Sequence, residues 1–138
     1  MIDKFDGEYA WLSNFYDAPV IYNGRRYLNS ESAFQAAKCP GREQEFENLK
    51  PGQAKRLGRR IGLRQDWDAV KDGIMYEVCA QKFLQNPALL RKLIDTGNEE
   101  LIEGNTWGDR YWGVCDGIGK NHLGKILMKL RDELSAKV

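Results

Sequence analysis

Apolar residues recur at helical spacing along two long stretches of this 138-residue chain. In the first stretch, the spacing predicts a helix over about residues 67–84, with Asp66 as its N-cap. Its apolar positions are Trp67, Val70, Ile74, Val78 and Phe83. The second stretch predicts a final helix with the apolar stripe Leu123, Ile126, Leu127, Leu130 and Leu134. Two such stripes indicate a fold that consists mainly of helices.

The β-structure predicted from the sequence is small. Residues 20–28 read as a hairpin, because the Asn23-Gly24 pair suits a type I′ turn. Residues 101–102 look like a short strand. Shorter helices are predicted over residues 30–38, capped by Asn29-Ser30-Glu31, over 43–48, from Pro51 onward, and over 87–97. We therefore expect a single domain over residues 1–138 that is α+β and helix-rich, or mainly α, with a small β-hairpin or sheet.

Composition narrows the classes of function. With 42% hydrophobic residues the chain can build a core, and a net charge of +1 indicates no global field toward nucleic acid or membrane. A local basic run could still attract phosphate: Lys55, Arg56, Arg59, Arg60 and Arg64. The absence of a long apolar run predicts neither a secretory signal nor a membrane span. Three widely spaced cysteines without a CxxC motif are typical of reduced thiols in a cytoplasmic protein.

The chain contains one histidine, His122, and this excludes several mechanisms. A serine triad would have to use His122, and no GxSxG motif accompanies it. A histidine-rich zinc site is impossible, and the Walker A pattern fails because Lys120 is followed by Asn121. Acid–base work therefore falls to Asp, Glu, Lys or Tyr, and no motif requires a metal or another cofactor.

Residues 103–113 form the segment most suggestive of an active site. Glu103, Asn105, Trp107, Asp109 and Trp112 all lie within it. A solvated loop rarely carries so much indole, and a core strand rarely carries two carboxylates. Paired carboxylates are the usual groups for cleaving a glycosidic bond, where one handles protons and the other stabilises positive charge or activates water. Alternatively, Glu103 and Asp109 are exposed loop acids, one of which bonds backbone N–H groups.

Two helical patterns could contribute further polar groups. Glu31, Gln35 and Lys38 share one face of the predicted helix over residues 30–38, which either lines a cleft or is simply solvated. The opposite face is alanine-rich, and small residues there permit close packing. One helical turn separates Trp67 from Lys71, so the pair could stack a flat ring and offer an amine; otherwise Trp67 belongs to the core and Lys71 to the surface.

Two weaker clusters lie near the ends of the chain. In residues 11–16, Ser13 and Asn14 could hydrogen-bond a ligand beside Trp11 or Phe15; alternatively an N-terminal strand packs these rings in the core. Residues 117–121 could bind a phosphate at the start of the last helix. The simpler reading is a turn with Asn121 as N-cap, which leaves His122 on the surface.

Together these segments resemble the NADAR domain family, also called the YbiA-like family. The resemblance covers nearly the whole chain. Its motifs, in order, are WLSNFY (11–16), SE to K (30–38), WDAVK with Met75 (67–75), KF (82–83), LIEG to D and WG (101–113), GKNHLG (119–124) and ILMKLR (126–131).

The resemblance implies N-glycosidase chemistry on ribosides. It implies that Glu31, Trp67 and Asp109 carry activity, with either Lys38 or Lys71 as a Schiff-base lysine. Members of the family act on ADP-ribosyl-guanine in DNA or RNA, in some cases as antitoxin to a DarT-type toxin, or on phosphoribosyl-amine intermediates of riboflavin synthesis. A non-catalytic ADP-ribose-binding module is the alternative from another class. No membrane partner is implied, and the oligomeric state stays open.

Overall fold

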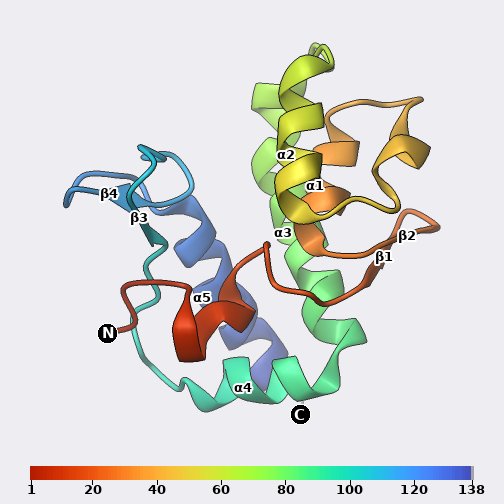
Figure 1. The fold of residues 1–138 in the computed structure, drawn as a ribbon. Helices are drawn as coiled ribbons and strands as arrows, with labels where there is room; N and C mark the ends of the chain where they lie inside the picture. The colour runs from red at the N-terminus through yellow and green to blue at the C-terminus, as the bar shows by residue number, and fades with distance from the viewer. Residues whose placement is uncertain (138) are drawn as a thin grey trace. The chain divides into compact units, whose positions relative to one another are not determined.

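The computed structural model describes residues 1–137, which fall into two compact units (Figure 1). The middle unit is Asn14–Pro87, and the terminal unit combines Met1–Ser13 with the chain from Ala88 onward. Within residues 1–137, no helix is both long and apolar enough to span a bilayer. The predicted single domain over residues 1–138 stays a prediction.

The middle unit begins with the predicted hairpin. Strand β1 (Val20–Tyr22) pairs antiparallel with β2 (Arg25–Tyr27), and Val20 lies opposite Tyr27. The two turn residues, Asn23 and Gly24, have φ angles of 51° and 80°. Positive φ at both positions is what a type I′ turn requires, so the hairpin prediction is confirmed.

Four helical segments follow the hairpin: α1 (Ser30–Ala37), the 3₁₀ helix η2 (Glu43–Phe46), α2 (Pro51–Arg60) and α3 (Trp67–Gln85). The Asn29 side chain caps α1 by accepting a hydrogen bond from the Ser32 N–H at 2.8 Å, as predicted. Asp66 stands at the N-cap position of α3 but makes no capping bond. Its carboxylate pairs instead with Arg64 at 2.6 Å, because a charged donor two residues away offers a stronger hydrogen bond.

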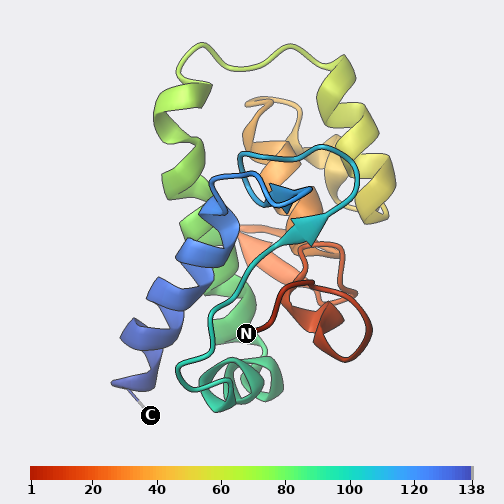
Figure 2. The same cartoon turned by 90° about the vertical axis from the view of Figure 1, so that its left-hand side faces the viewer.

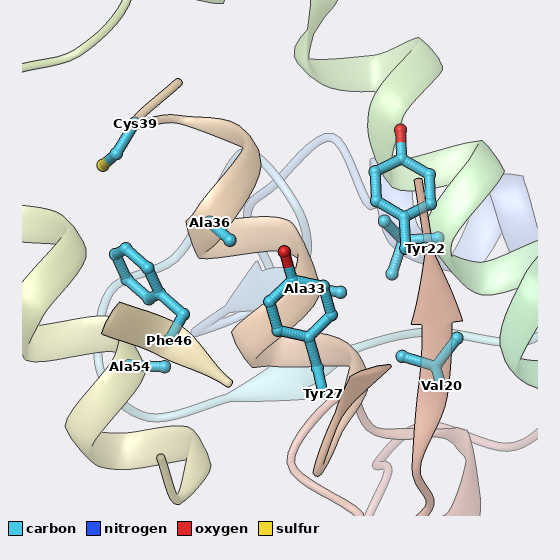
Figure 3. Packing of buried hydrophobic residues seen from close by; sticks show 9 residues of the cluster. Val20, Tyr22, Tyr27, Ala33, Ala36, Cys39, Phe46 and Ala54 are labelled. Carbon is cyan, nitrogen blue, oxygen red and sulfur yellow. The ribbon is translucent and has the colours of Figure 1, made fainter. Parts of the chain in front are cut away.

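The core of the middle unit lies among the hairpin, α1, η2, α2 and α3 (Figure 3). Tyr27 and Phe46 are the largest of its side chains that are almost completely buried. Ala33 and Ala36 of α1 are also fully buried, and their small side chains let neighbouring segments approach the helix closely. The predicted close packing on the alanine-rich face of α1 is confirmed.

The terminal unit joins both ends of the chain. Its elements are η1 (Gly7–Leu12), α4 (Pro87–Asp95), β3 (Gly104–Asn105), β4 (Val114–Cys115) and α5 (His122–Ser135) (Figure 2). Ile2 exchanges backbone hydrogen bonds with Glu100 and Ile102, both at 2.8 Å. The predicted strand over residues 101–102 is wrong in position: Leu101 forms only an isolated bridge to Ile2, and the paired strand begins at Gly104.

Two side chains hold the start and the middle of α5. Asn121 stands at the N-cap position of α5, as predicted, but it has a left-handed φ of 54° and its side chain makes no capping bond. Its side chain accepts from the Glu103 N–H and donates to the Leu101 carbonyl, both at 2.9 Å. Arg131 is buried and donates to the Glu99 carbonyl at 2.7 Å. These bonds satisfy backbone groups of the irregular segment after α4.

Candidate active site

The polar face of α1 is buried. Glu31 is 8% exposed and Gln35 is 4% exposed, so the alternative of a solvated face is wrong for both residues. The Gln35 amide donates to a Glu31 carboxylate oxygen at 2.6 Å, across one helical turn. A buried carboxylate is costly unless other groups hold it, and this bond fixes its orientation. The face therefore offers an oriented carboxylate rather than a surface charge.

Gly58 of α2 makes room for Gln35. A Cβ atom at Gly58 would collide with Gln35 Oε1, an oxygen that is buried and accepts no hydrogen bond from the residues the structure describes. The contact between α1 and α2 therefore requires a residue without a side chain at position 58. Nothing in the sequence pattern of α2 signals this requirement.

We expect Gly58→Ala to lower the free energy of unfolding by about 1–3 kcal/mol, because the added methyl group overpacks this contact. It should also lower the rate of catalysis, since Gln35 must move away from Glu31. Gly73→Ala is the matched control: Gly73 lies inside α3 with nothing within 4 Å of an added Cβ, so this change should stabilise by about 0.5–1 kcal/mol. Urea unfolding measures both, and equal stability of the two variants would contradict the contact.

Lys38 follows α1 and lies beside two aromatic rings. Its Nζ is 5.6 Å from the Phe34 ring centroid and 5.8 Å from that of Trp67. The two rings pack on each other at 5.1 Å, and Trp67 is 7% exposed. Burial lowers the pKa of Lys38, Glu31 opposes this shift, and the cations Arg59 and Lys55 add to it. A lysine with a lowered pKa has more of its amine neutral and therefore nucleophilic.

Lys71 differs from Lys38 in its surroundings. Its Nζ forms an ion pair with Asp68 at 3.1 Å, and Asp68 is almost fully exposed. The Lys71 amine is therefore already engaged by a carboxylate of its own helix. Of the two candidate lysines, Lys38 therefore has the environment that suits a nucleophile.

Asn14 supports α1 from the segment before the hairpin. Its side-chain oxygen accepts from the Ser30 hydroxyl at 2.8 Å, and its backbone carbonyl accepts from the Glu31 N–H at 3.1 Å. Its amide also lies 3.3 Å from Met75 Sδ. Through these contacts Asn14 stabilises the first turn of α1. Phe15, by contrast, is 46% exposed, with Lys55 Nζ 5.8 Å from its ring centroid.

Lys82 is a buried cation that the sequence reasoning did not place among the site residues. It is 1% exposed, and its Nζ lies near the rings of Phe83 and Tyr16, at 5.3 and 5.9 Å. Burial lowers the pKa of Lys82 to about 8. The signal available in the sequence was a lysine four residues after Val78, on the apolar stripe of α3.

We expect the free energy of unfolding to rise with pH above about 8, where folded Lys82 loses its proton while the unfolded chain still binds one. Lys82→Met should lack this contribution. Chemical unfolding of both proteins between pH 7 and 10 isolates it, because the other titrating groups cancel in the difference. A difference that does not change with pH would contradict a lowered pKa.

In the terminal unit, Asn105 organises the tryptophan-rich segment. Its amide donates to a Glu103 carboxylate oxygen at 2.8 Å and to the Asp109 carbonyl at 2.9 Å. Its side-chain oxygen accepts from the Asp109 N–H at 3.0 Å. Gly113 closes the same arrangement, because a Cβ there would collide with the Glu103 backbone carbonyl. The Asn105 side chain is thus used in hydrogen bonds that stabilise the loop itself.

Asp109 turns the chain toward the second tryptophan. Its Oδ1 accepts from the backbone N–H groups of Tyr111 and Trp112 at 3.1 and 2.9 Å. This is the alternative role considered for one loop acid, and it leaves Oδ2 without a hydrogen bond from residues 1–137. Asp109 can therefore hold the loop with one oxygen and present the other.

The aromatic residues of this unit fall into two groups. Tyr111 packs edge-on against Trp112 at 4.8 Å and lies 4.4 Å from the His122 ring, so His122 is a packing residue at the start of α5. Trp107 is 61% exposed, whereas Trp11 is buried at the end of η1. Ser13 follows η1 and its N–H donates to the Ala10 carbonyl at 3.0 Å.

Proteins of known sequence and structure resemble this chain over almost its whole length. The NADAR domain matches residues 2–135. The chain belongs to the NADAR domain family. The NADAR relative N-glycosidase YbiA of Shigella boydii is 37% identical over 134 residues, covering 93% of this chain and 83% of that protein. The NMR structure of the E. coli protein YbiA superposes with a TM-score of 0.85 at 34% identity, covering 99% of this chain and 88% of the other.

Two further NADAR relatives bear on activity. N-glycosidase Npun_R5314 of Nostoc punctiforme is 35% identical over 135 residues. Riboflavin biosynthesis protein VVA0006 of Vibrio vulnificus is 36% identical over 135 residues, and this chain spans 36% of that protein's length. These names support an N-glycosidase of the NADAR family. The family and its helix-rich α+β fold are as predicted.

Proposed function

We propose that this chain is an N-glycosidase that removes ADP-ribose from the exocyclic amine of guanine in nucleic acid. The observation that carries the proposal is the buried Glu31 carboxylate, oriented by Gln35 on the helix that Lys38 directly follows. An oriented carboxylate can transfer a proton or stabilise charge during C–N cleavage at an anomeric carbon, and an amine with a lowered pKa can act as a nucleophile there.

The reaction has two chemical tasks. The departing amine must gain a proton as the C–N bond breaks, and positive charge on the sugar carbon must be stabilised until water adds to it. We assign these tasks to Glu31 and Asp109. The pH dependence of kcat in the Glu31→Gln and Asp109→Asn variants decides which carboxyl acts as the acid, because replacing the acid removes the fall in rate at high pH.

Lys38 offers a covalent form of the same reaction. With the sugar ring opened, the neutral Nζ attacks the C1′ carbon, the guanine amine leaves with a proton, and a Schiff base to Lys38 remains. Water then hydrolyses the Schiff base, which restores the lysine and releases ADP-ribose. The lowered pKa of Lys38 supports this route over one through Lys71.

A second substrate is supported by one comparison. The Vibrio vulnificus relative is named as a riboflavin biosynthesis protein, so a phosphoribosyl-amine intermediate of that synthesis is the alternative substrate. The experiment is incubation of the purified protein with ADP-ribosyl-guanine DNA and, separately, with the riboflavin intermediate. Mass spectrometry follows the released sugar. Faster release from the DNA supports the proposal, release from the intermediate alone favours the alternative, and binding without release points to a non-catalytic ADP-ribose-binding module.

A role as antitoxin to a DarT-type toxin follows only if DNA is the substrate. Co-expression of the chain with an active toxin tests it: rescue of growth that is lost with Glu31→Gln would support an antitoxin.

A further inference from the structure

Helix α2 and its flanks carry positive charge without any acid. Residues 50–64 contain six basic side chains and no Asp or Glu: Lys50, Lys55, Arg56, Arg59, Arg60 and Arg64. Arg64 is paired with Asp66. Arg56, Arg59 and Arg60 are exposed and form no ion pair with residues 1–137. An exposed helix usually mixes both signs, because opposite charges one turn apart stabilise it. Helix α2 has no such pairs of opposite charge, because it contains no acidic residue.

The same arginines line a groove of about 570 Å³, which we call the α2 groove. Its residues are Leu49, Gln53, Arg56, Leu57, Arg59 and Arg60. Leu49 and Leu57 are half-buried and pack on the core, so the groove has an apolar floor beneath a rim of guanidinium groups. A single-stranded nucleic acid is complementary to this groove, because its flat bases suit the apolar floor and its charged phosphates suit the guanidinium groups. The guanidinium fork also matches phosphate geometry.

Helix α2 also packs against α1 (Figure 1). Gly58 contacts Gln35, and the positive charges of Lys55 and Arg59 lower the pKa of Lys38. One helix therefore contacts Gln35, the residue that orients Glu31, through Gly58, and lines the α2 groove with Arg56 and Arg60.

We propose, building on the function proposed above, that the α2 groove binds the phosphodiester backbone of single-stranded nucleic acid flanking the modified guanine. The chemistry of the adduct favours a single strand. The exocyclic amine of guanine lies in the minor groove of a duplex and takes part in base pairing, so a bulky sugar on it disfavours the paired state. The Arg56 and Arg60 guanidinium groups contact phosphates, and these contacts carry no sequence preference.

The test uses the double variant Arg56→Gln/Arg60→Gln in the full chain. Arg59 is left intact because it acts on Lys38. Fluorescence anisotropy with a labelled, unmodified single-stranded DNA should show binding on the order of tenfold weaker at low salt. The slope of log K against log salt should fall in magnitude by about 1.4, or about 0.7 for each phosphate that an arginine no longer neutralises.

The matched control removes two positive charges elsewhere. Arg91→Gln/Lys92→Gln on α4 changes the net charge equally, at two exposed residues without an ion pair to residues 1–137. Binding should stay at the wild-type level in this variant. Equal loss in both variants would overturn the inference, because net charge alone would then explain it.

Kinetics separate the groove from the catalytic proposal. With an ADP-ribosylated oligonucleotide, the groove variant should raise KM and leave kcat unchanged, while KM for the free ADP-ribosylated nucleoside should not move. If KM rises for both substrates, the arginines hold the ADP-ribose itself and the inference is overturned. If the wild type cleaves neither substrate but DNA binding still depends on Arg56 and Arg60, the catalytic proposal fails and the groove assignment stands.

Discussion

Replacing Glu31 with Gln should lower kcat by about 10²–10⁴ while leaving the protein folded, because removing one group that transfers a proton or stabilises charge typically costs that much. The glutamine has nearly the same shape and can still accept the hydrogen bond from Gln35 through its oxygen. Packing of α1 is therefore kept, and only the charge and the titratable proton are lost. Steady-state kinetics on the ADP-ribosylated oligonucleotide measure the effect.

Glu45→Gln is the matched control for this prediction. Glu45 lies in the same unit, is exposed, and pairs with Arg42 on the surface at 2.6 Å. Its removal should leave kcat at the wild-type value, since exposed ion pairs contribute little to the stability of the fold. A Glu31→Gln protein with wild-type kcat and an unchanged melting temperature would remove Glu31 from the mechanism.

Replacing Lys38 with Met should abolish a substrate adduct that borohydride can trap, and should lower kcat by at least about 10², a loss typical for a catalytic side chain. The methionine keeps an apolar side chain against Phe34 and Trp67, so the aromatic contacts survive. Intact-protein mass spectrometry after reduction measures the adduct. Lys71→Met is the control, and its adduct should form as in the wild type.

The pH dependence of adduct trapping is a second test of Lys38 as the nucleophile. Because the pKa of Lys38 is lowered, adduct formation should rise with pH and should level off at a pH below the pKa of an ordinary lysine. Arg59→Gln should move this profile to higher pH, since the Arg59 charge helps to keep the Lys38 pKa low. An adduct that survives Lys38→Met, or a profile that Arg59→Gln leaves in place, would contradict the role of Lys38.

Local rules predicted most of the secondary structure. The Asn23-Gly24 turn, the Asn29 cap and the apolar stripe of α5 were all predictable, because each depends on residues within one or two turns of the chain. The strand near Leu101 was misplaced for the opposite reason. Its pairing partner is Ile2, at the far end of the sequence, and no local pattern reports that contact.

The candidate residues were predictable as types but not in their environments. Helical spacing put Glu31 and Gln35 on one face, but their burial depends on packing against other segments, such as the approach of Gly58 to Gln35. Likewise, sequence left Lys38 and Lys71 equivalent, and their different neighbours separate them. The burial of Lys38 arises from contacts between segments, which a single sequence does not specify, whereas the Lys71–Asp68 ion pair forms within one turn of α3.

Single-turnover release from an oligonucleotide carrying one ADP-ribosylated guanine tests the account most directly. Wild-type protein in excess should convert it to the unmodified oligonucleotide and free ADP-ribose, and Glu31→Gln at the same concentration should do so at least about 10²-fold more slowly. Release at the same rate by both proteins, or no release by the wild type from this substrate or the riboflavin intermediate, would contradict an N-glycosidase that depends on Glu31.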